Sequence, residues 1–487
     1  MLGPWIATAI IVGTVIGSGV FVKGRTVANS VDQLWLVVAV WVLGGVLALL
    51  GSLALAEIAV LFPRAGGNYV FLREGYGRCA GFLWGWVEFW IIRAASGAAL
   101  ATMFTESFHD VLRQSLYPGQ KVEVLSFWAR QFMTVCVLVG LTAVNIRGTF
   151  LGGAVQFAIT VLKVASLLFL IALPFVIYAM GREPKPSVAN LAMNGPKVAN
   201  NLAGFGAALI GVLWAYNGWM NIAPVAGEVK NPQRNLPLAL LVAVFILIAV
   251  YSGANLAYHL VIPREVIIAK GADGKLSSTP LATEFCEALL GPVGIVIASA
   301  IVMTSVLGAL NGNVLVGPRL LYAMAHDKLA PAKLAELHPR YQTPALATIV
   351  MTAWACLLIV VLGALLQSDL PLFDTKDIGP DGKPVKDSPF EVLTKFVIFG
   401  SVTFETLAVA TIFVFRKRIP VTAENRPYRC WGYPVVPALY CAIMAAVLVT
   451  FFVNPGSRSE ALVGLGFIAT GALVYALFFR KREQPLR

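Results

Sequence analysis

The chain has 487 residues, of which 58% are hydrophobic and 13% are charged, and its formal net charge is +12. Soluble globular proteins are about 45–50% apolar and about 25% charged, so this composition excludes a water-soluble domain and predicts a polytopic membrane protein. The basic residues lie in short connections between apolar runs. That distribution is typical of membrane topology and not of a nucleic-acid groove, so we expect a lipid bilayer and no nucleic acid as partner.

Twelve apolar runs are long enough to span a bilayer, which requires about 20 mostly apolar residues. We therefore predict an all-α protein with twelve transmembrane helices. They occupy approximately residues 5–30, 33–61, 79–108, 129–146, 149–180, 201–228, 235–261, 291–325, 344–366, 389–415, 433–454 and 460–479. Two connections are also predicted to be structured. Residues 62–77 form an amphipathic stretch at the inner interface, and residues 278–291 form a short outer helix.

The distribution of lysine and arginine predicts the orientation of the chain. If the N-terminus is cytoplasmic, the inner connections hold 18 basic residues in 74 positions and the outer ones hold 14 in 110. The positive-inside rule then places both termini in the cytoplasm of a multi-pass protein of the cell (inner or plasma) membrane. Only four residues precede the first run, and no cleavage site follows a short apolar segment, so we expect an uncleaved first helix.

Two of the twelve runs contain helix-breaking residues near their middle. The first carries Gly13, Gly17, Ser18 and Gly19, and the sixth carries the pair Asn217-Gly218. Close helix–helix contact is an alternative reading of the first pattern, and a structural kink is an alternative reading of the second. The paired occurrence favours two discontinuous helices that meet at a transport site.

The positions of the breaks predict a repeated architecture. Each interrupted helix is the first of a block of five, so residues 1–180 and 201–415 form two inverted repeats. Residues 416–487 add the last two helices and a cytoplasmic tail.

The backbone groups that a break releases predict the chemistry of the ligand. N–H groups at the restart of the first helix favour an anion, and glycine allows its close approach. These N–H groups belong to Gly17, Ser18 and Gly19. Carbonyls left unpaired at the two breaks favour a cation. They belong to Val15, Ile16, Trp214, Ala215 and Asn217. The combination fits an α-amino acid zwitterion, and valine at position 19 is predicted to block the carboxylate in a protein that still folds.

Lys163 lies in the middle of the fifth run, where a lysine is costly and is functional by default. A snorkelling lysine is the alternative. We expect a fixed ammonium beside helices one and eight, in the place of a bound sodium ion, with Thr304 and Ser305 as acceptors. Transport would then need no sodium.

Other polar residues in the runs are less specific. Glu88 and Arg93 are five residues apart, which does not place them on one face of an α-helix, so a structural network is predicted in place of a simple pair. Asn311 either reaches the substrate or caps a helix irregularity. Glu57 and Glu228 lie near inner helix ends, where solvated or paired carboxylates are favoured over a gate.

Four segments resemble the L-type amino acid transporter family of the amino acid–polyamine–organocation superfamily. They are GTVIGSGVFV (13–22), WVEFWIIR (86–93), WAYNGWMNIAPVAGEVKNPQRNLPLAL (214–240) and LNGNVLVGPRLLYAMAHDKLAP (310–331). The resemblance covers nearly the whole chain in the right order. It implies a five-plus-five inverted repeat with two appended helices, and sodium-independent exchange of amino acids by alternating access.

The resemblance also implies roles for single residues. Ser18 and Gly19 match the carboxylate-binding positions, and Val15, Trp214 and Asn217 match those whose carbonyls hold the amine. Trp214 also matches the aromatic gate that covers the substrate from outside. Lys163 matches the lysine of helix five, and Asn311 matches a substrate-facing asparagine of helix eight.

Two departures from the family pattern narrow the expected function. Residues 109–130 contain no cysteine, so no disulfide-linked heavy chain is expected and the chain looks like a stand-alone prokaryotic member. Met220 replaces a residue that is polar in several relatives, which suggests apolar or neutral L-amino acids as substrates.

Several alternatives remain open from the sequence. A proton-coupled symporter of the same fold would need a buried group that changes charge. A polyamine or cationic amino acid carrier would need acids in the pocket, and helices one and six have none before Glu228. A non-transporting membrane sensor is a different class. The chain has no HExxH, GxSxG or phosphate-loop motif, and its six cysteines lack metal-binding spacing, so no enzyme, cofactor or metal is expected.

Overall fold

The computed structural model describes residues 3–480 apart from short gaps. The gaps are 64–65, 121, 148, 185, 194–196, 199–200, 270–275, 278, 369–373, 379–383, 387–388, 421–427 and 454–457. Within this part, eleven helical segments are long and apolar enough to cross a membrane, and one bent pair of shorter helices makes a twelfth. The predicted all-helical, twelve-span membrane fold is therefore confirmed.

The spans follow the predicted runs closely. They are the pair α1 (Pro4–Val15) and α2 (Gly19–Ser30), then α3 (Leu34–Leu61), α5 (Arg78–Val87) continuing through the π-helical turn η1 (Glu88–Arg93) into α6 (Ala94–Leu116), α7 (Phe127–Ile146), α8 (Thr149–Ala179), α9 (Asn201–Tyr216) with the 3-10 helix η3 (Trp219–Glu228), α10 (Pro232–Val261), α13 (Pro292–Val316) with α14 (Pro318–His326), α15 (Ala345–Gln367), α16 (Pro389–Arg418), α17 (Val435–Val453) and α18 (Arg458–Phe478).

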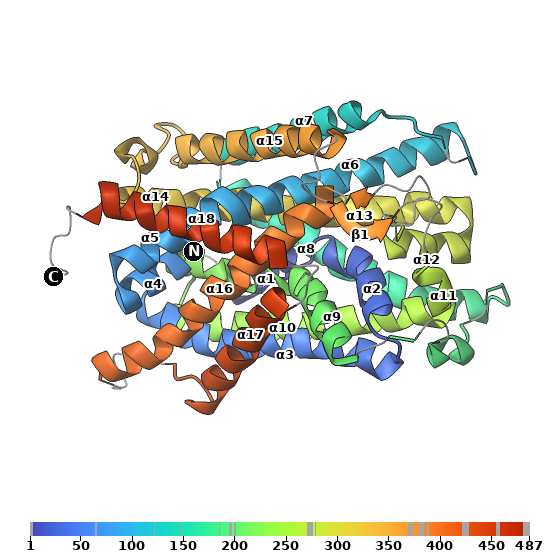
Figure 1. The fold of residues 1–487 in the computed structure, drawn as a ribbon, viewed down its shortest axis with the longest axis horizontal. Coiled ribbons are helices and arrows are strands. Elements are labelled where there is room, and N and C mark those ends of the chain that lie inside the picture. The colour runs from blue at the N-terminus through green and yellow to red at the C-terminus, as the bar shows by residue number, and fades with distance from the viewer. Residues whose placement is uncertain are drawn as a thin grey trace.

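Short elements connect the spans. They are α4 (Asn68–Tyr76), η2 (Val188–Ala192), α11 (Arg264–Ile267), α12 (Leu281–Leu290), η4 (Ala332–Ala335) and an antiparallel pair of strands, β1 (Asp374–Ile378) and β2 (Pro384–Lys386). The predicted interfacial segment thus contains α4, and the predicted outer helix is α12. The strand pair was not predicted. Figure 1 shows α4 and α14 at one end of the molecule and α11 and α12 at the other, as alternating spans require.

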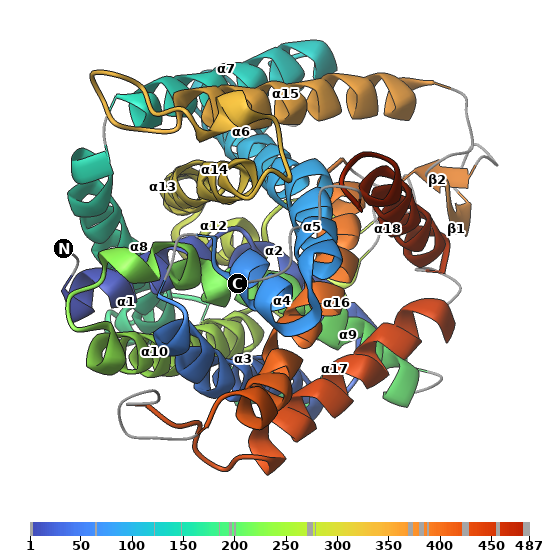
Figure 2. The ribbon, with the colours of Figure 1, turned by 90° about the vertical axis from the view of Figure 1, so that its left-hand side faces the viewer.

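The broken helices lie at the centre of the bundle. α1 packs against α8, α10 and α13, and α2 packs against α9 and α12. α7 and α15 lie side by side along one edge, and α17 and α18 lie on another side (Figure 2). The chain therefore surrounds its two least regular spans with continuous ones, which keeps freed backbone groups away from lipid. The inverted relation of residues 1–180 and 201–415 stays a prediction.

Both predicted interruptions are present. α1 ends at Val15, Ile16 is extended with ψ 96°, and α2 starts again at Gly19 with its axis bent by 47°. α9 ends at Tyr216, and Gly218 has φ +103°, a conformation that glycine adopts without strain. The chain then continues as η3, a narrower helix.

The relation between Glu88 and Arg93 corrects one expectation. The six residues from Glu88 to Arg93 form a π-helical turn, in which residues five apart lie above one another. Arg93 Nε therefore lies 2.5 Å from Glu88 Oε1, and the two do form a direct ion pair. The α-helical spacing rule failed because the helix is locally wider.

A buried ion pair closes the end of the bundle near α4. Glu57 is 2% exposed, and its two oxygens accept from Arg416 Nε and Nη2 at 2.8 and 2.6 Å. The Cys430 N–H also donates to Glu57, at 2.7 Å. The preferred reading of Glu57 as a paired helix end agrees with these contacts. Glu228 lies in η3, and its side chain is outside the described residues.

The Cys430 thiol is expected to be unreactive in the folded protein. Burial, followed by the charge of Glu57, raises the pKa of Cys430 to about 12, so almost no thiolate exists at pH 7.5. We expect N-ethylmaleimide to label Cys430 only after denaturation, and mass spectrometry of the labelled peptide checks this. Glu57→Gln removes the nearby negative charge and should speed labelling; equal rates in folded and denatured wild-type protein would contradict the assignment.

Candidate functional site

One cavity opens onto both helix breaks. It encloses about 910 Å³ of space that no protein atom fills, open solvent at its mouth included. The lining residues that matter for the argument are Thr14, Val15, Gly17, Ser18 and Gly19 from the first break, Trp214, Asn217, Gly218, Met220 and Asn221 from the second, and Glu88, Arg93, Asn313, Ser401 and Glu405 from other helices. The lining also reaches Asn68 in α4 and Leu320 in α14, so the cavity extends from the breaks toward that end of the molecule.

Lys163 supports the first break through backbone carbonyls. Its ammonium is buried and donates to the carbonyl oxygens of Gly13 and Ile16, both at 2.8 Å. Ser305 Oγ donates to the carbonyls of Gly17 at 3.0 Å and Ile16 at 3.4 Å. A lysine and a serine from two continuous helices thus hold the opened segment from outside the cavity.

The polar partners of Lys163 differ from those expected. The Thr304 hydroxyl donates to the Ala300 carbonyl one turn back in its own helix, at 2.8 Å, so it does not act as an acceptor for the ammonium. Ser305 lies at the break, but as a donor to the carbonyls of Ile16 and Gly17, the first of which Lys163 also reaches. The reason is that a released carbonyl accepts hydrogen bonds more readily than a hydroxyl that already has a partner in its own helix.

Four of the five carbonyls that were expected to be unpaired have donors. Lys163 and Ser305 take that of Ile16, and the Asn217 N–H donates to that of Trp214 at 3.2 Å. The Tyr251 hydroxyl reaches the carbonyls of Val15 and Ala215, at 3.2 and 3.0 Å. Ile16 and Ala215 also do not line the cavity.

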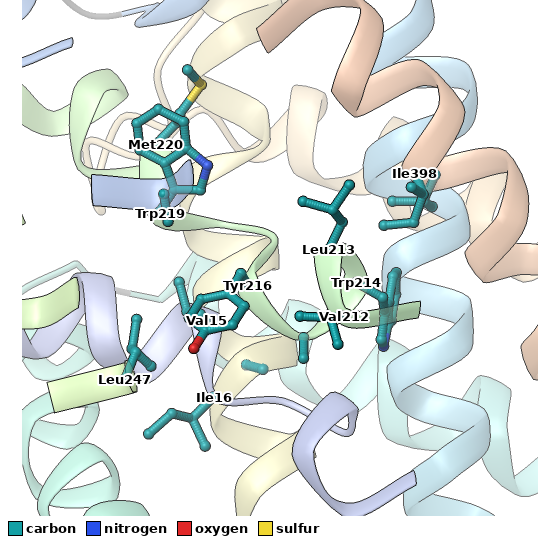
Figure 3. Close-up of a cluster of buried hydrophobic side chains, with 14 of the residues drawn as sticks. Val15, Ile16, Val212, Leu213, Trp214, Tyr216, Trp219, Met220, Leu247 and Ile398 are labelled. Atoms are coloured by element: carbon teal, nitrogen blue, oxygen red, sulfur yellow. The ribbon is translucent and has the colours of Figure 1, made fainter. Parts of the chain in front are cut away.

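These carbonyls still leave room for a ligand cation. One hydroxyl has a single proton, so Tyr251 satisfies only one of its two acceptors at a time, and every carbonyl has a second lone pair. Val15, Trp214 and Asn217 all line the cavity. Figure 3 shows the second break from the side, with Trp214 and Tyr216 before it, Trp219 and Met220 beyond it, and Val15 beside Tyr216.

The N–H side of the site is built by the start of α2. Ser18 is the N-cap of α2 and makes no side-chain cap hydrogen bond, while its carbonyl accepts from the N–H groups of Phe21 and Val22 at 3.1 and 3.2 Å. The N–H groups that precede these bonds, at Gly19 and Val20, are the ones that a helix start leaves for a ligand. Gly17, Ser18 and Gly19 all line the cavity. The positive end of the α2 dipole therefore faces the same space as the carbonyls of Val15 and Asn217.

Gly19 has a second reason to be glycine. A Cβ atom there would lie 2.5 Å from the Cα of Ala215, on the facing broken helix. A Gly19→Val protein is therefore expected to lose stability as well as transport, because the two broken helices touch through their backbones at this point. That it still folds stays a prediction. Gly17 is less confined, since its nearest neighbour would be a flexible Leu100 methyl group at 3.2 Å.

Trp214 lines the cavity and is held by contacts to both broken helices' surroundings. Its indole Nε1 donates to Ser18 Oγ at 3.2 Å, and its ring meets Phe390 edge-on at 5.9 Å between centroids. The Lys23 ammonium lies 5.2 Å from the centre of the Phe390 ring.

The structural network predicted for Glu88 and Arg93 is present and crosses the cavity, with partners that the sequence did not predict. Arg93 Nη2 donates to Asn221 Oδ1 at 2.7 Å and Nη1 donates to Asn313 Oδ1 at 3.2 Å, while Glu88 neutralises the guanidinium. Glu405 of α16 lines the same cavity and is 8% exposed. An acid inside an apolar run is a signal for function, so Glu405 was detectable in the tenth run.

Asn311 does not face the cavity, which corrects another expectation. Its Oδ1 accepts from Asn145 Nδ2 at 2.9 Å, and its Nδ2 donates to Gln156 Oε1 at 3.2 Å. Asn313, two residues later, lines the cavity in its place. Two residues rotate an α-helix by about 200°, so the two asparagines point to opposite sides.

A membrane protein in which two interrupted helices share a buried polar cavity belongs to the class of secondary transporters. The amino acid permease family matches residues 2–478, and the chain belongs to this family. The chain is 30% identical over 474 residues to the serine/threonine exchanger SteT of Bacillus subtilis (strain 168), covering 95% of this chain and 94% of that protein.

Animal proteins are similar over much of the chain as well. The Asc-type amino acid transporter 1 of Mus musculus is 28% identical over 482 residues, which is 98% of this chain and 81% of that protein. The b(0,+)-type amino acid transporter 1 of Homo sapiens is 28% identical over 348 residues, or 72% and 67%. These matches confirm the family resemblance, and the chain is a multi-pass amino acid permease.

Proposed function

We propose that this permease exchanges neutral L-amino acids without sodium, by alternating access. The N–H groups at the start of α2 would hold the substrate carboxylate. The carbonyls of Val15, Trp214 and Asn217 would hold its amine. The observation that carries the proposal is that donors of the first break and acceptors of both breaks line one cavity.

Three further observations support parts of the proposal. The relative named a serine/threonine exchanger favours exchange and a small neutral substrate. The Lys163 ammonium on two carbonyls of the first break favours independence from sodium, because a fixed positive charge already lies there. The absence of cysteine from residues 109–130 favours a transporter without a disulfide-linked heavy chain.

The lining residues also favour an inward-facing state. The cavity reaches α4 and α14, and Trp214 with Phe390 covers it on the other side. If both termini are cytoplasmic, the open end faces the cytoplasm and Trp214 is the outer gate. An outward-facing state would then require the Trp214–Ser18 hydrogen bond to break.

The experiment is exchange by purified protein in proteoliposomes. Vesicles loaded with unlabelled L-serine or L-alanine should take up the same labelled amino acid, and empty vesicles should not. Uptake should be equal in sodium chloride and choline chloride. Uptake that requires sodium contradicts the fixed-charge role of Lys163, and uptake that needs a proton gradient but no internal amino acid favours a symporter. A protein that binds amino acids but never exchanges them is a sensor.

A further inference from the structure

A second, smaller cavity adjoins the main one behind α16. It lies between α3, α9, α16 and α17, and it shares three lining residues with the main cavity: Asn217, Ser401 and Glu405. Trp219 and Tyr440 form part of its wall. These three shared residues therefore lie where the two cavities meet. Ser401 and Glu405 are four residues, or about one helical turn, apart on α16.

Glu405 is a buried acid that has no ion-pair partner in the part of the chain that the structure describes. Glu88 and Arg93 are the other charged groups that line the main cavity, and they neutralise each other at 2.5 Å. In the part of the chain that the structure describes, no lysine, arginine or histidine nitrogen lies within 4.0 Å of the Glu405 carboxylate. The Trp219 side chain is its hydrogen-bond partner, which leaves most of its acceptor capacity unused.

Tyr440 supplies a second unsatisfied polar group in the small cavity. It is 1% exposed, and its hydroxyl has no hydrogen-bond partner among the described residues. The Trp219 ring packs edge-on against the Tyr440 ring, at 6.3 Å between centroids. A buried carboxyl group with one hydrogen-bond partner and a buried hydroxyl with none among the described residues both keep capacity for hydrogen bonds to a ligand.

Polar side chains also connect the second helix break to Glu405. Asn217 lies at the second helix break, and its Nδ2 donates to Ser401 Oγ at 3.0 Å. A substrate whose amine lies on the carbonyl of Asn217 therefore has Ser401 beside its side chain and Glu405 about 6 Å farther along α16. Acceptors line this direction from the main cavity into the small one.

We propose that Asn217, Ser401, Glu405 and Tyr440 form a side-chain subsite that selects amino acids whose side chain ends in a hydrogen-bond donor. A hydroxyl on a short side chain would donate to Ser401, and an ammonium or amide on a longer one would donate to Glu405. This inference rests on the proposed function, because it needs the backbone of the substrate at the two breaks. It also revises the substrate preference that Met220 suggested, from apolar to donor-bearing side chains.

The test compares ligands that are matched in shape. Unlabelled amino acids compete with the exchange of labelled L-alanine in proteoliposomes. Inhibition by threonine is compared with inhibition by valine, and inhibition by lysine with inhibition by norleucine. In the wild-type protein we expect the donor-bearing member of at least one pair to inhibit about tenfold more strongly. The threonine–valine pair reports a hydroxyl, and the lysine–norleucine pair reports an ammonium. Equal inhibition within both pairs would overturn the proposal.

Variants then assign the preference to residues, with the ratio within each pair as the readout. Glu405→Met should abolish the lysine preference and Ser401→Ala the threonine preference, while the exposed Glu265→Gln on α11 should keep both ratios. Glu405→Gln should keep a hydroxyl preference and lose an ammonium preference. Ratios that survive both Glu405→Met and Ser401→Ala would contradict the subsite.

A second variant keeps the test valid if Glu405→Met does not fold. Tyr440→Phe removes a hydroxyl that has no protein partner, so we expect normal folding and a smaller ratio for the pair that reaches the small cavity. An unchanged ratio in a folded Tyr440→Phe protein would remove Tyr440 from the subsite. If no labelled amino acid exchanges at all, the proposed function fails; if alanine exchanges without any donor preference, only this inference fails.

Discussion

Lys163→Met is expected to lower amino acid exchange by at least about 100-fold. Methionine keeps an unbranched side chain that is one atom shorter, but it cannot donate to the carbonyls of Gly13 and Ile16, which lie 2.8 Å from the ammonium. Each buried carbonyl that loses its donor costs about 1–3 kcal/mol, and about 2.8 kcal/mol is already a 100-fold change in an equilibrium. The break between α1 and α2 then loses its fixed geometry. Exchange of labelled L-serine in proteoliposomes measures the effect.

Thr304→Ala is the matched control for this prediction. Its hydroxyl bonds only within its own helix, so we expect exchange within about twofold of wild type. Ser305→Ala removes the hydroxyl that donates to the carbonyls of Gly17 and Ile16. Its exchange rate should lie between those of Lys163→Met and Thr304→Ala. Thermal unfolding in detergent should separate lost stability from lost transport. Wild-type exchange by a folded Lys163→Met protein would contradict the structural role of the ammonium.

Gly19→Ala is expected to abolish exchange and to lower the thermal stability. The added methyl group would lie 2.5 Å from the Cα and 2.6 Å from the Cβ of Ala215, and a backbone atom cannot rotate away as a side chain can. Overpacking of this kind costs about 1–3 kcal/mol, and here it separates the two broken helices that form the site. Uptake and the unfolding temperature of the purified protein are the measurements.

Two other glycines provide controls of graded severity. At Gly211 of α9 the added atom would meet a Thr26 methyl group at 3.5 Å, an ordinary contact, so Gly211→Ala should be close to wild type. At Gly17 it would meet Leu100 at 3.2 Å and reduce the cavity, so Gly17→Ala should fold and exchange more slowly. If all three variants exchange alike, the close backbone contact at Gly19 has no role in transport.

The parts of the fold that depend on composition and backbone freedom were predictable. Apolar runs predict the spans because only long apolar helices are stable in the hydrocarbon core of a bilayer. Glycine clusters predict the breaks because glycine is a poor helix former. Both breaks lie where Gly17 to Gly19 and Asn217-Gly218 predicted them. The ends of the spans also follow the apolar runs to within a few residues in most cases.

The parts that depend on the rotation of one helix against another were not predictable. Whether Asn311 or Asn313 faces the cavity depends on the angular position of α13, which the hydrophobic pattern of a span buried on most sides does not determine. Likewise, the donors to the freed carbonyls come from distant parts of the chain. Lys163 is 150 residues from Gly13, and Tyr251 is 236 residues from Val15 and 36 from Ala215. The π-helical turn at Glu88 has no signal in the spacing rules for an α-helix.

Backbone recognition of a zwitterion by the two breaks is the central claim, and an experimental density map with a bound amino acid tests it most directly. The prediction is a carboxylate within hydrogen-bonding distance of the N–H groups at Gly17 to Gly19 and an amine facing the carbonyls of Val15 and Asn217. Arg93 offers a competing anion site in the same cavity. A substrate carboxylate paired with the Arg93 guanidinium, with the two breaks unoccupied, would contradict the claim.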